Sequence, residues 1–160
     1  MANTFSQIYL QFVFAVQGRQ SLIPRGHKEE LHKYMTSLVQ VRKAKMLAVH
    51  CMPDHTHLFV GYKPSVLISD FVKEIKVESN EFIKRKKWIN GAFNWQEARL
   101  TGRAGLRCIL SYGHSQIDSV CRYVLNQETH HKQKSFREEY HELLERFVVP
   151  FEERYLFEWI

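Results

Sequence analysis

Two histidines separated by one residue are the first candidates for chemistry in this sequence. His55 and His57 lie in the otherwise apolar segment MPDHTHLFV, residues 52–60. Side chains alternate between the two faces of a β-strand, so both imidazoles would lie on the same face of a sheet. Neutral imidazole is a common ligand of divalent transition metals. The pair therefore indicates either half of a metal site or two partly exposed polar side chains.

A tyrosine in a helical pattern is the second candidate. Tyr123, Gln127 and His130 recur at i, i+4 and i+7, which places them on one side of a helix. The amide oxygen of Gln127 can act as a metal ligand one turn away from the Tyr123 hydroxyl. By itself, Tyr123 fits an amphipathic tyrosine at the edge of a core better than a nucleophile, because such tyrosines are common.

Together the two motifs predict a phosphoryl-transfer site. A phenol has a pKa near 10 and is a poor nucleophile at neutral pH without help. A metal bound by His55, His57 and Gln127 could polarise a phosphate and orient it for attack by Tyr123. The three cysteines have no closely spaced pair that could complete a structural zinc site instead.

The elements that must position these residues follow from periodicity and from turn and capping residues. Alternation predicts strands, and apolar stripes at helical spacing predict helices. Strands are expected at 8–16, 45–51, 55–62, 93–96 and 106–112, and helices from Pro24 through Leu38 and at 65–89, 116–133 and 135–147. Ser135 and Glu138 form a capping box at the start of the last helix. The tail, 148–160, is aromatic and is expected to dock on the body.

This order of elements predicts an α+β fold. It is the ferredoxin-like or RRM-like plan, an antiparallel sheet with helices packed on one side, followed by a C-terminal tyrosine-bearing helix. The 160 residues fit a single domain, with a core at about 5–133 and a C-terminal helix and tail at 134–160.

Composition limits the kinds of binding partner and cellular compartment that fit this sequence. The formal charge of +6 and the pI near 9.3 fit a polyanionic partner or an ordinary basic protein. An odd number of scattered cysteines favours a reducing compartment. The sequence shows neither a signal peptide nor an apolar run long enough for a membrane span. A cytoplasmic protein with no membrane partner is expected.

The two chemical motifs also carry a family resemblance. The segments MPDHTHL (52–58), YVLNQETHH (123–131) and FREEY (136–140), followed by Leu143 and Leu144, resemble the IS200/IS605-type transposases. These are single-tyrosine members of the HUH (His-hydrophobe-His) endonuclease superfamily. The similarity covers most of the chain, with Thr56 at the position usually held by a bulky hydrophobe.

The resemblance implies a function in detail. It implies a homodimer that cleaves and rejoins single-stranded DNA at transposon ends, where imperfect hairpins are recognised. Tyr123 would form a 5′-phosphotyrosine link and release a 3′-OH. His55 and His57 match the metal-binding pair and Gln127 the third ligand, with Mg²⁺ or Mn²⁺ as the ion. The tyrosine helix of such dimers can dock on the partner's histidine pair.

One segment departs from the family pattern. Residues 98–110 are longer and richer in arginine than expected, which fits a loop, an added DNA contact or a disturbance of activity. Arg99, Arg103 and Arg107 are candidate DNA contacts for this reason. The basic run KRKK (84–87) with Trp88 is another, although cationic side chains also favour a helix C-terminus.

Two other functions compete with a DNA-cleaving enzyme. The first is a catalytically impaired or non-catalytic relative that binds single-stranded nucleic acid on the same fold, although the RNP aromatic signature of RRM domains is absent. The second is a phosphohydrolase of the histidine-triad type. That site requires a further histidine two residues after His57, and this chain has Phe59 at that position.

Overall fold

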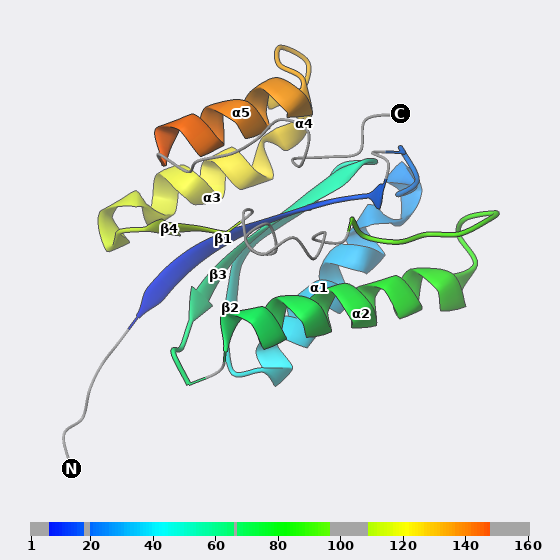
Figure 1. Cartoon of the computed structure of the whole chain (residues 1–160), viewed down its shortest axis with the longest axis horizontal. Coiled ribbons are helices and arrows are strands. Elements are labelled where there is room, and N and C mark those ends of the chain that lie inside the picture. The colour runs from blue at the N-terminus through cyan, green and yellow to red at the C-terminus, as the bar shows by residue number, and fades with distance from the viewer. Residues whose placement is uncertain (1–6, 18–19, 66, 97–108, 148–160) are drawn as a thin grey trace, which may run out of the picture.

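A four-stranded antiparallel sheet forms the centre of the protein (Figure 1). The computed structural model describes residues 7–17, 20–65, 67–96 and 109–147. The strands lie in the order β2-β3-β1-β4, so β1 and β3 occupy the middle of the sheet. Their bounds are β1 Ile8–Ala15, β2 Lys45–Cys51, β3 His55–Tyr62 and β4 Ile109–Tyr112.

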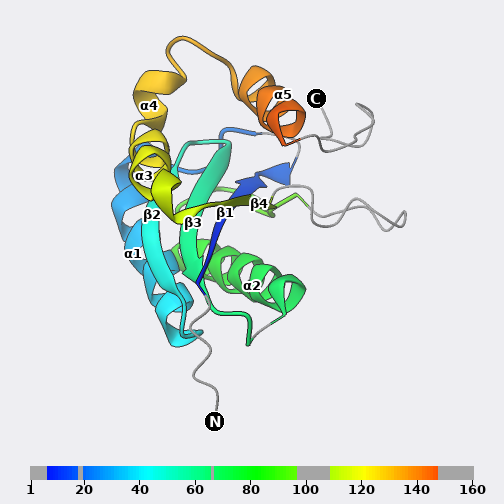
Figure 2. The same cartoon turned by 90° about the vertical axis from the view of Figure 1, so that its left-hand side faces the viewer.

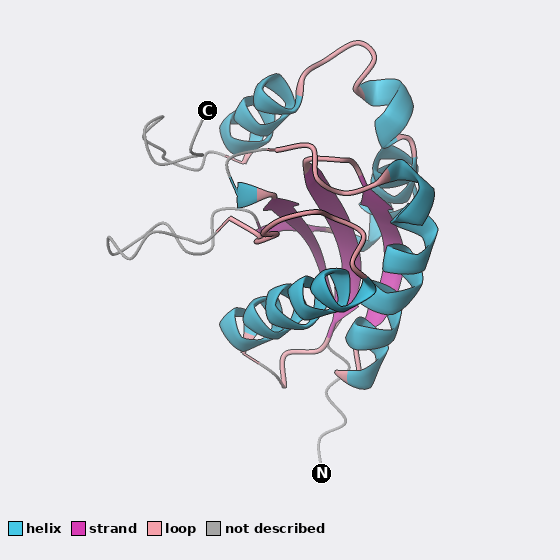
Figure 3. Cartoon of the chain, turned by 90° about the vertical axis from the view of Figure 1, so that its right-hand side faces the viewer, coloured by secondary structure: helices cyan, strands magenta, loops and turns pink. Residues whose placement is uncertain are grey.

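Helices cover both faces of this sheet (Figures 2 and 3). Their bounds are η2 Arg25–His27, α1 Lys28–Val41, α2 Ile68–Lys86, η3 His114–Gln116, α3 Ile117–Leu125, α4 Gln127–His130 and α5 Phe136–Arg146. In the described part of the chain, no helix is both long and apolar enough to cross a bilayer.

The main core lies between the sheet and the α1–α2 layer. The even-numbered residues of β1 and β3 face this layer. Their apolar side chains and the helical side chains that contact them are fully or almost fully buried. They include Leu10, Phe12, Phe14, Leu58 and Val60 from the sheet, and Leu31, Met35, Phe71 and Ile75 from the helices. Burying such side chains contributes about 1.5–3 kcal/mol each, which fixes α1 and α2 on this face.

The odd-numbered residues face the opposite layer, which contains the C-terminal helices. Two smaller apolar clusters join the layers there. Tyr9 and Phe59 pack against Val120 and Val124 of α3, and Val13 and Ala15 pack against Phe136, Tyr140 and Leu144 of α5. The predicted fold is confirmed, with two helices on one side and the tyrosine-bearing helix on the other.

Thr56 shows how a polar residue occupies the central position of the His-x-His motif. Its side chain points into the α1–α2 side of the sheet and is fully buried. Its hydroxyl donates to Cys51 Sγ at 2.6 Å, so burial leaves no unpaired donor.

Several predicted boundaries change in the structure. The predicted strand at 93–96 is only an isolated bridge, from Trp95 to Val16. The predicted helix at 116–133 is two helices, because Asn126 leaves the helical conformation between α3 and α4. The predicted capping box is confirmed: the Ser135 hydroxyl accepts from the Glu138 backbone N–H. Residues 97–108, with the three candidate arginines, and the tail at 148–160 lie outside the described residues.

Candidate metal and tyrosine site

His55 and His57 lie next to each other on the α3–α5 face of β3. Their ring centroids are 5.2 Å apart, and the two side chains are 1% and 0% exposed. Their antiparallel neighbours on β1 are Ala15 and Val13. The period-two alternation places both imidazoles on one face of the strand, as the spacing predicts, and the packing of α3 and α5 covers that face.

Each of these histidines has one ring nitrogen occupied by a neighbouring side chain. Asp54 Oδ1 lies 2.7 Å from Nδ1 of His55, and Gln11 Nε2 lies 2.9 Å from Nδ1 of His57. The Tyr112 hydroxyl donates in turn to Gln11 Oε1 at 2.7 Å. The Nε2 atoms of both histidines are buried without a hydrogen-bond partner among the described residues. A carboxylate opposite Nδ1, as at His55, is typical of metal-ligating histidines, whereas at His57 the Gln11 amide donates to Nδ1.

Burial keeps His55 neutral at ordinary pH. It lowers the pKa of His55 from 6.5 to about 4, although the hydrogen bond with Asp54 acts in the opposite direction. A neutral imidazole retains the lone pair that a metal needs. His55 is therefore ready to bind an ion without first losing a proton.

Tyr123 of α3 lies beside His57, and Gln127 of α4 contacts Tyr123. The Tyr123 ring lies edge-on to His57, with the centroids 5.9 Å apart. Gln127 is fully buried, and its Nε2 donates to the Tyr123 carbonyl at 3.2 Å. Its Oε1 has no hydrogen-bond partner in the described part of the chain. His130 also lies near, with its ring centroid 5.4 Å from that of Tyr123.

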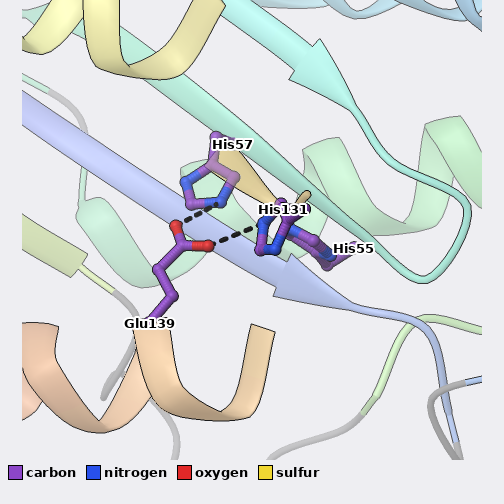
Figure 4. A group of neighbouring side chains, drawn as sticks. All are labelled: His55, His57, His131 and Glu139. Atoms are coloured by element: carbon purple, nitrogen blue, oxygen red, sulfur yellow. Dashed lines mark ion pairs between the residues drawn. The ribbon is translucent and has the colours of Figure 1, made fainter. Parts of the chain in front are cut away.

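The structure adds two residues that the sequence analysis did not single out. Glu139 of α5 is 2% exposed, and its Oε1 lies 3.1 Å from His57 Nε2. Its Oε2 lies 2.7 Å from Nε2 of His131, which follows α4 (Figure 4). The Tyr123 hydroxyl donates to Glu139 Oε1. One carboxylate therefore contacts both the histidine cluster and the candidate nucleophile.

A signal for Glu139 was present in the sequence. It lies on the apolar stripe of α5 together with Phe136, Tyr140, Leu143 and Leu144. A glutamate is almost never fully buried unless it is paired, so its place on a buried stripe indicates a partner on the facing element. Nothing local in the sequence, however, says that the partner is His57.

These contacts set the protonation states around Glu139. Burial by itself would raise the pKa of the Glu139 carboxyl, but the contacts with His131 and His57 outweigh it and hold the pKa well below its usual range. Burial and the Glu139 charge both raise the pKa of Tyr123. In His131, the contact with Glu139 outweighs burial and raises the pKa. The site thus combines an ionised carboxylate with a protonated phenol.

The donor set fits a metal ion. His55, His57, His131 and Glu139 each offer one ligand atom, and these four atoms lie within 4.8 Å of one another. Three imidazole nitrogens and a carboxylate oxygen, all buried or nearly so, are ligands that divalent metals accept. The buried Gln127 oxygen, predicted as the third ligand, has no hydrogen-bond partner in the described residues and remains a candidate donor.

A cavity of about 470 Å³ opens beside the tyrosine. Tyr112, Tyr123, His130 and Glu139 line it, together with the cationic side chains of Lys134 and Arg146. Glu142 also lines the cavity and pairs with Lys134 at 2.5 Å, so the lining carries both signs of charge. The cavity therefore places the candidate nucleophile beside a lining of mixed charge.

The basic run at the end of α2 has a structural explanation. Trp88 stacks on His27, with the centroids 4.6 Å apart, and packs edge-on against Phe82. Lys86 pairs with Glu30 at 2.5 Å. The α1–α2 layer to which these residues belong lies across the sheet from the candidate site. These contacts favour a role in holding α1 and α2 together, and the predicted contact with DNA remains a prediction.

A solved structure of another protein shares this fold. A crystal structure of a protein from Deinococcus radiodurans R1 that has been assigned as a transposase superposes with a TM-score of 0.55. The two sequences are 17% identical, and the similarity covers 79% of this chain and 95% of that chain. At this identity, the likeness shows the fold alone. None of the curated proteins compared matches this chain.

The sequence itself identifies the family. The family described as "Transposase IS200 like" matches residues 4–127, which include His55, His57, Tyr123 and Gln127. The chain belongs to the IS200-like transposase family. His131 and Glu139 lie beyond the matched residues.

Proposed function

We propose that this protein is a DNA transposase that cleaves and rejoins single-stranded DNA at the ends of an insertion sequence. Tyr123 is the proposed nucleophile. The observation that carries the proposal is the meeting of Tyr123 with His57 and Glu139 in one site, with the rings of Tyr123 and His57 5.9 Å apart. A nucleophile beside a set of metal donors is the arrangement that phosphoryl transfer requires.

The proposed reaction exchanges one phosphodiester for another. The Tyr123 oxygen forms a bond to phosphorus, the bond from phosphorus to the 3′ oxygen breaks, and the strand leaves as a 3′-OH. The phenol loses one proton, and the 3′ oxygen gains one. The product is a 5′-phosphotyrosine link, and attack by a 3′-OH reverses the step to rejoin DNA.

The residues of the chain contribute to this reaction in distinct ways. Glu139 accepts the hydrogen bond of the Tyr123 hydroxyl and so fixes the phenol beside His57. The cavity beside Tyr123 would admit the DNA strand, with Arg146 in its lining as a cationic contact for phosphate. A divalent ion, Mg²⁺ or Mn²⁺ by family resemblance, would be held by His55, His57 and Gln127 and would polarise the scissile phosphate.

Covalent capture tests the proposal. Purified protein is incubated with divalent ions and single-stranded oligonucleotides that tile the genomic flanks of the coding sequence, and the products are separated in SDS. We expect an SDS-resistant DNA adduct that disappears with a chelator and in Tyr123→Phe. The matched control is Tyr34→Phe, which keeps the ring stacked on Phe82 of the opposite layer and should form the adduct normally.

The outcomes distinguish a DNA-cleaving enzyme from a non-catalytic protein that binds single-stranded nucleic acid. An adduct that persists in Tyr123→Phe would refute the assignment of the nucleophile. Binding of the same oligonucleotides with no adduct, insensitive both to the chelator and to His57→Ala, would support the non-catalytic nucleic-acid-binding function instead.

We further propose that the enzyme acts as a homodimer on ends that carry hairpins. In this structure Tyr123 meets His57 of its own chain. Mixing Tyr123→Phe protein with His57→Ala protein tests whether the same pairing operates in catalysis. We expect each variant to be inactive alone, so activity recovered in the mixture requires a site built from two chains, and no recovery supports a site within one chain.

A further inference from the structure

The part of the site contributed by the chain after α4 is not explained by the family match. His131 and Glu139 lie beyond the matched residues 4–127, yet their ligand atoms lie within 4.8 Å of those of His55 and His57. The four side chains come from β3, from the residue after α4 and from α5. They meet because α5 packs on Val13 and Ala15 of β1.

The outer contacts of His55 and His131 leave Nε2 of each neutral ring with the lone pair, whereas Gln11 Nε2 donates to Nδ1 of His57, so that the neutral His57 ring carries its proton on Nε2. Nδ1 of His131 lies 2.9 Å from the Lys134 carbonyl oxygen, which only accepts, so Nδ1 carries the proton of the neutral ring. The carboxylate of Asp54 has the same effect on Nδ1 of His55. In both neutral rings Nε2 then carries the lone pair. A ligand nitrogen opposite a carbonyl or carboxylate partner is the usual arrangement in protein metal sites.

The contact between His131 and Glu139 requires a positive charge. Nε2 of His131 and Oε2 of Glu139 are 2.7 Å apart, and both atoms are acceptors when the ring is neutral. Neither atom has hydrogen-bond geometry with any described residue. Two buried acceptors at this distance repel each other unless a proton or a cation joins them.

We infer that His131 and Glu139 join His55 and His57 as ligands of one transition-metal ion, so that the site prefers an ion such as Zn²⁺ or Co²⁺ to Mg²⁺. Imidazole nitrogen suits zinc and its neighbours, whereas Mg²⁺ prefers oxygen ligands and retains its waters. The inference rests on the metal dependence of the proposed function. It changes both the ligand set and the class of ion that family resemblance implies.

Cobalt binding tests the inference without DNA or catalysis. Co²⁺ is titrated into metal-free full-length protein while its visible absorption is followed, and Zn²⁺ or excess Mg²⁺ is then added as a competitor. We expect a saturable cobalt spectrum that Zn²⁺ abolishes and Mg²⁺ does not. His131→Gln and Glu139→Gln should each weaken Co²⁺ binding by at least about tenfold and alter the spectrum.

Matched variants separate ligand loss from general damage. Glu142→Gln alters an exposed carboxylate on the same helix, one that pairs with Lys134, and His114→Gln alters an exposed histidine. Both should bind Co²⁺ as the wild type does, and circular dichroism checks the fold of every variant. Gln127→Ala tests the ligand implied by family resemblance.

Three results would overturn the inference. They are a wild-type protein that binds no Co²⁺, displacement of Co²⁺ by Mg²⁺ as readily as by Zn²⁺, and full affinity in His131→Gln and Glu139→Gln. A wild-type protein that binds Co²⁺ as expected but forms no DNA adduct would leave this inference standing and refute the proposed reaction.

Discussion

Phe136 is the side chain through which α5 is expected to be held on the sheet. It is the first residue of α5 and is 3% exposed. Its ring lies parallel to the imidazole of His55, with the centroids 3.8 Å apart and the planes 9° apart. It also belongs to the small cluster that joins α5 to Val13 and Ala15 of β1. We predict that Phe136→Ala releases α5, and Glu139 with it, from the histidine pair.

The loss of stability expected in Phe136→Ala follows from the burial of the Phe136 side chain. Truncating a buried phenylalanine to alanine costs about 3–5 kcal/mol, which includes the lost transfer free energy and the cavity left behind. The loss of the stacked pair with His55 adds to the upper part of this range. Because this cluster is separate from the α1–α2 core, the cost should fall on the docking of α5. Protection of the α5 amides should drop by a factor of about 10² to 10⁴, while that of α1 changes little.

Hydrogen exchange followed by mass spectrometry measures both regions in one experiment. Phe71→Ala is the matched control, because Phe71 is 1% exposed in the main core against Phe12 and Tyr62. That variant should lower protection across α1 and the sheet as well. The reasoning is refuted if Phe136→Ala leaves α5 protected, or if α1 loses as much protection as α5.

Two further predictions concern the opposite layer of the fold. Burial and nearby His50 lower the pKa of His32 from 6.5 to about 4, and its Nε2 accepts from the Cys51 backbone N–H. Since the folded pKa lies below the unfolded one, this contribution to stability is complete above about pH 6.5 and is lost as the pH falls toward 4. The difference in unfolding free energy between wild type and His32→Asn should therefore shrink over that interval in urea titrations, and a constant difference would contradict this. Ser79→Ala should destabilise the protein by about 1–3 kcal/mol, because the Ser79 hydroxyl is the acceptor of the buried Trp95 indole N–H at 2.8 Å. Chemical denaturation measures it, and a loss below about 0.5 kcal/mol would mean that another acceptor replaces the hydroxyl.

Local patterns in the sequence were sufficient for most elements. The alternation at 8–16 and 55–62 corresponds to β1 and β3, and the capping box at Ser135 marks the start of α5. These features could be predicted because strand alternation, helical periodicity and caps depend on residues a few positions apart. The break at Asn126 could not, since the helical pattern continues through it.

The sequence by itself determined the chemistry that is available. It placed His55 and His57 on one face of a strand, put Tyr123 and Gln127 on one side of a helical stretch, and carried the match to the IS200-like transposase family. Only the tertiary structure decided which residues share the site. It brought His131 and Glu139 to the histidine pair and the Tyr123 hydroxyl to Glu139. The physical reason is that contacts between segments far apart in the chain depend on how α5 packs across β1, and no local spacing records that packing.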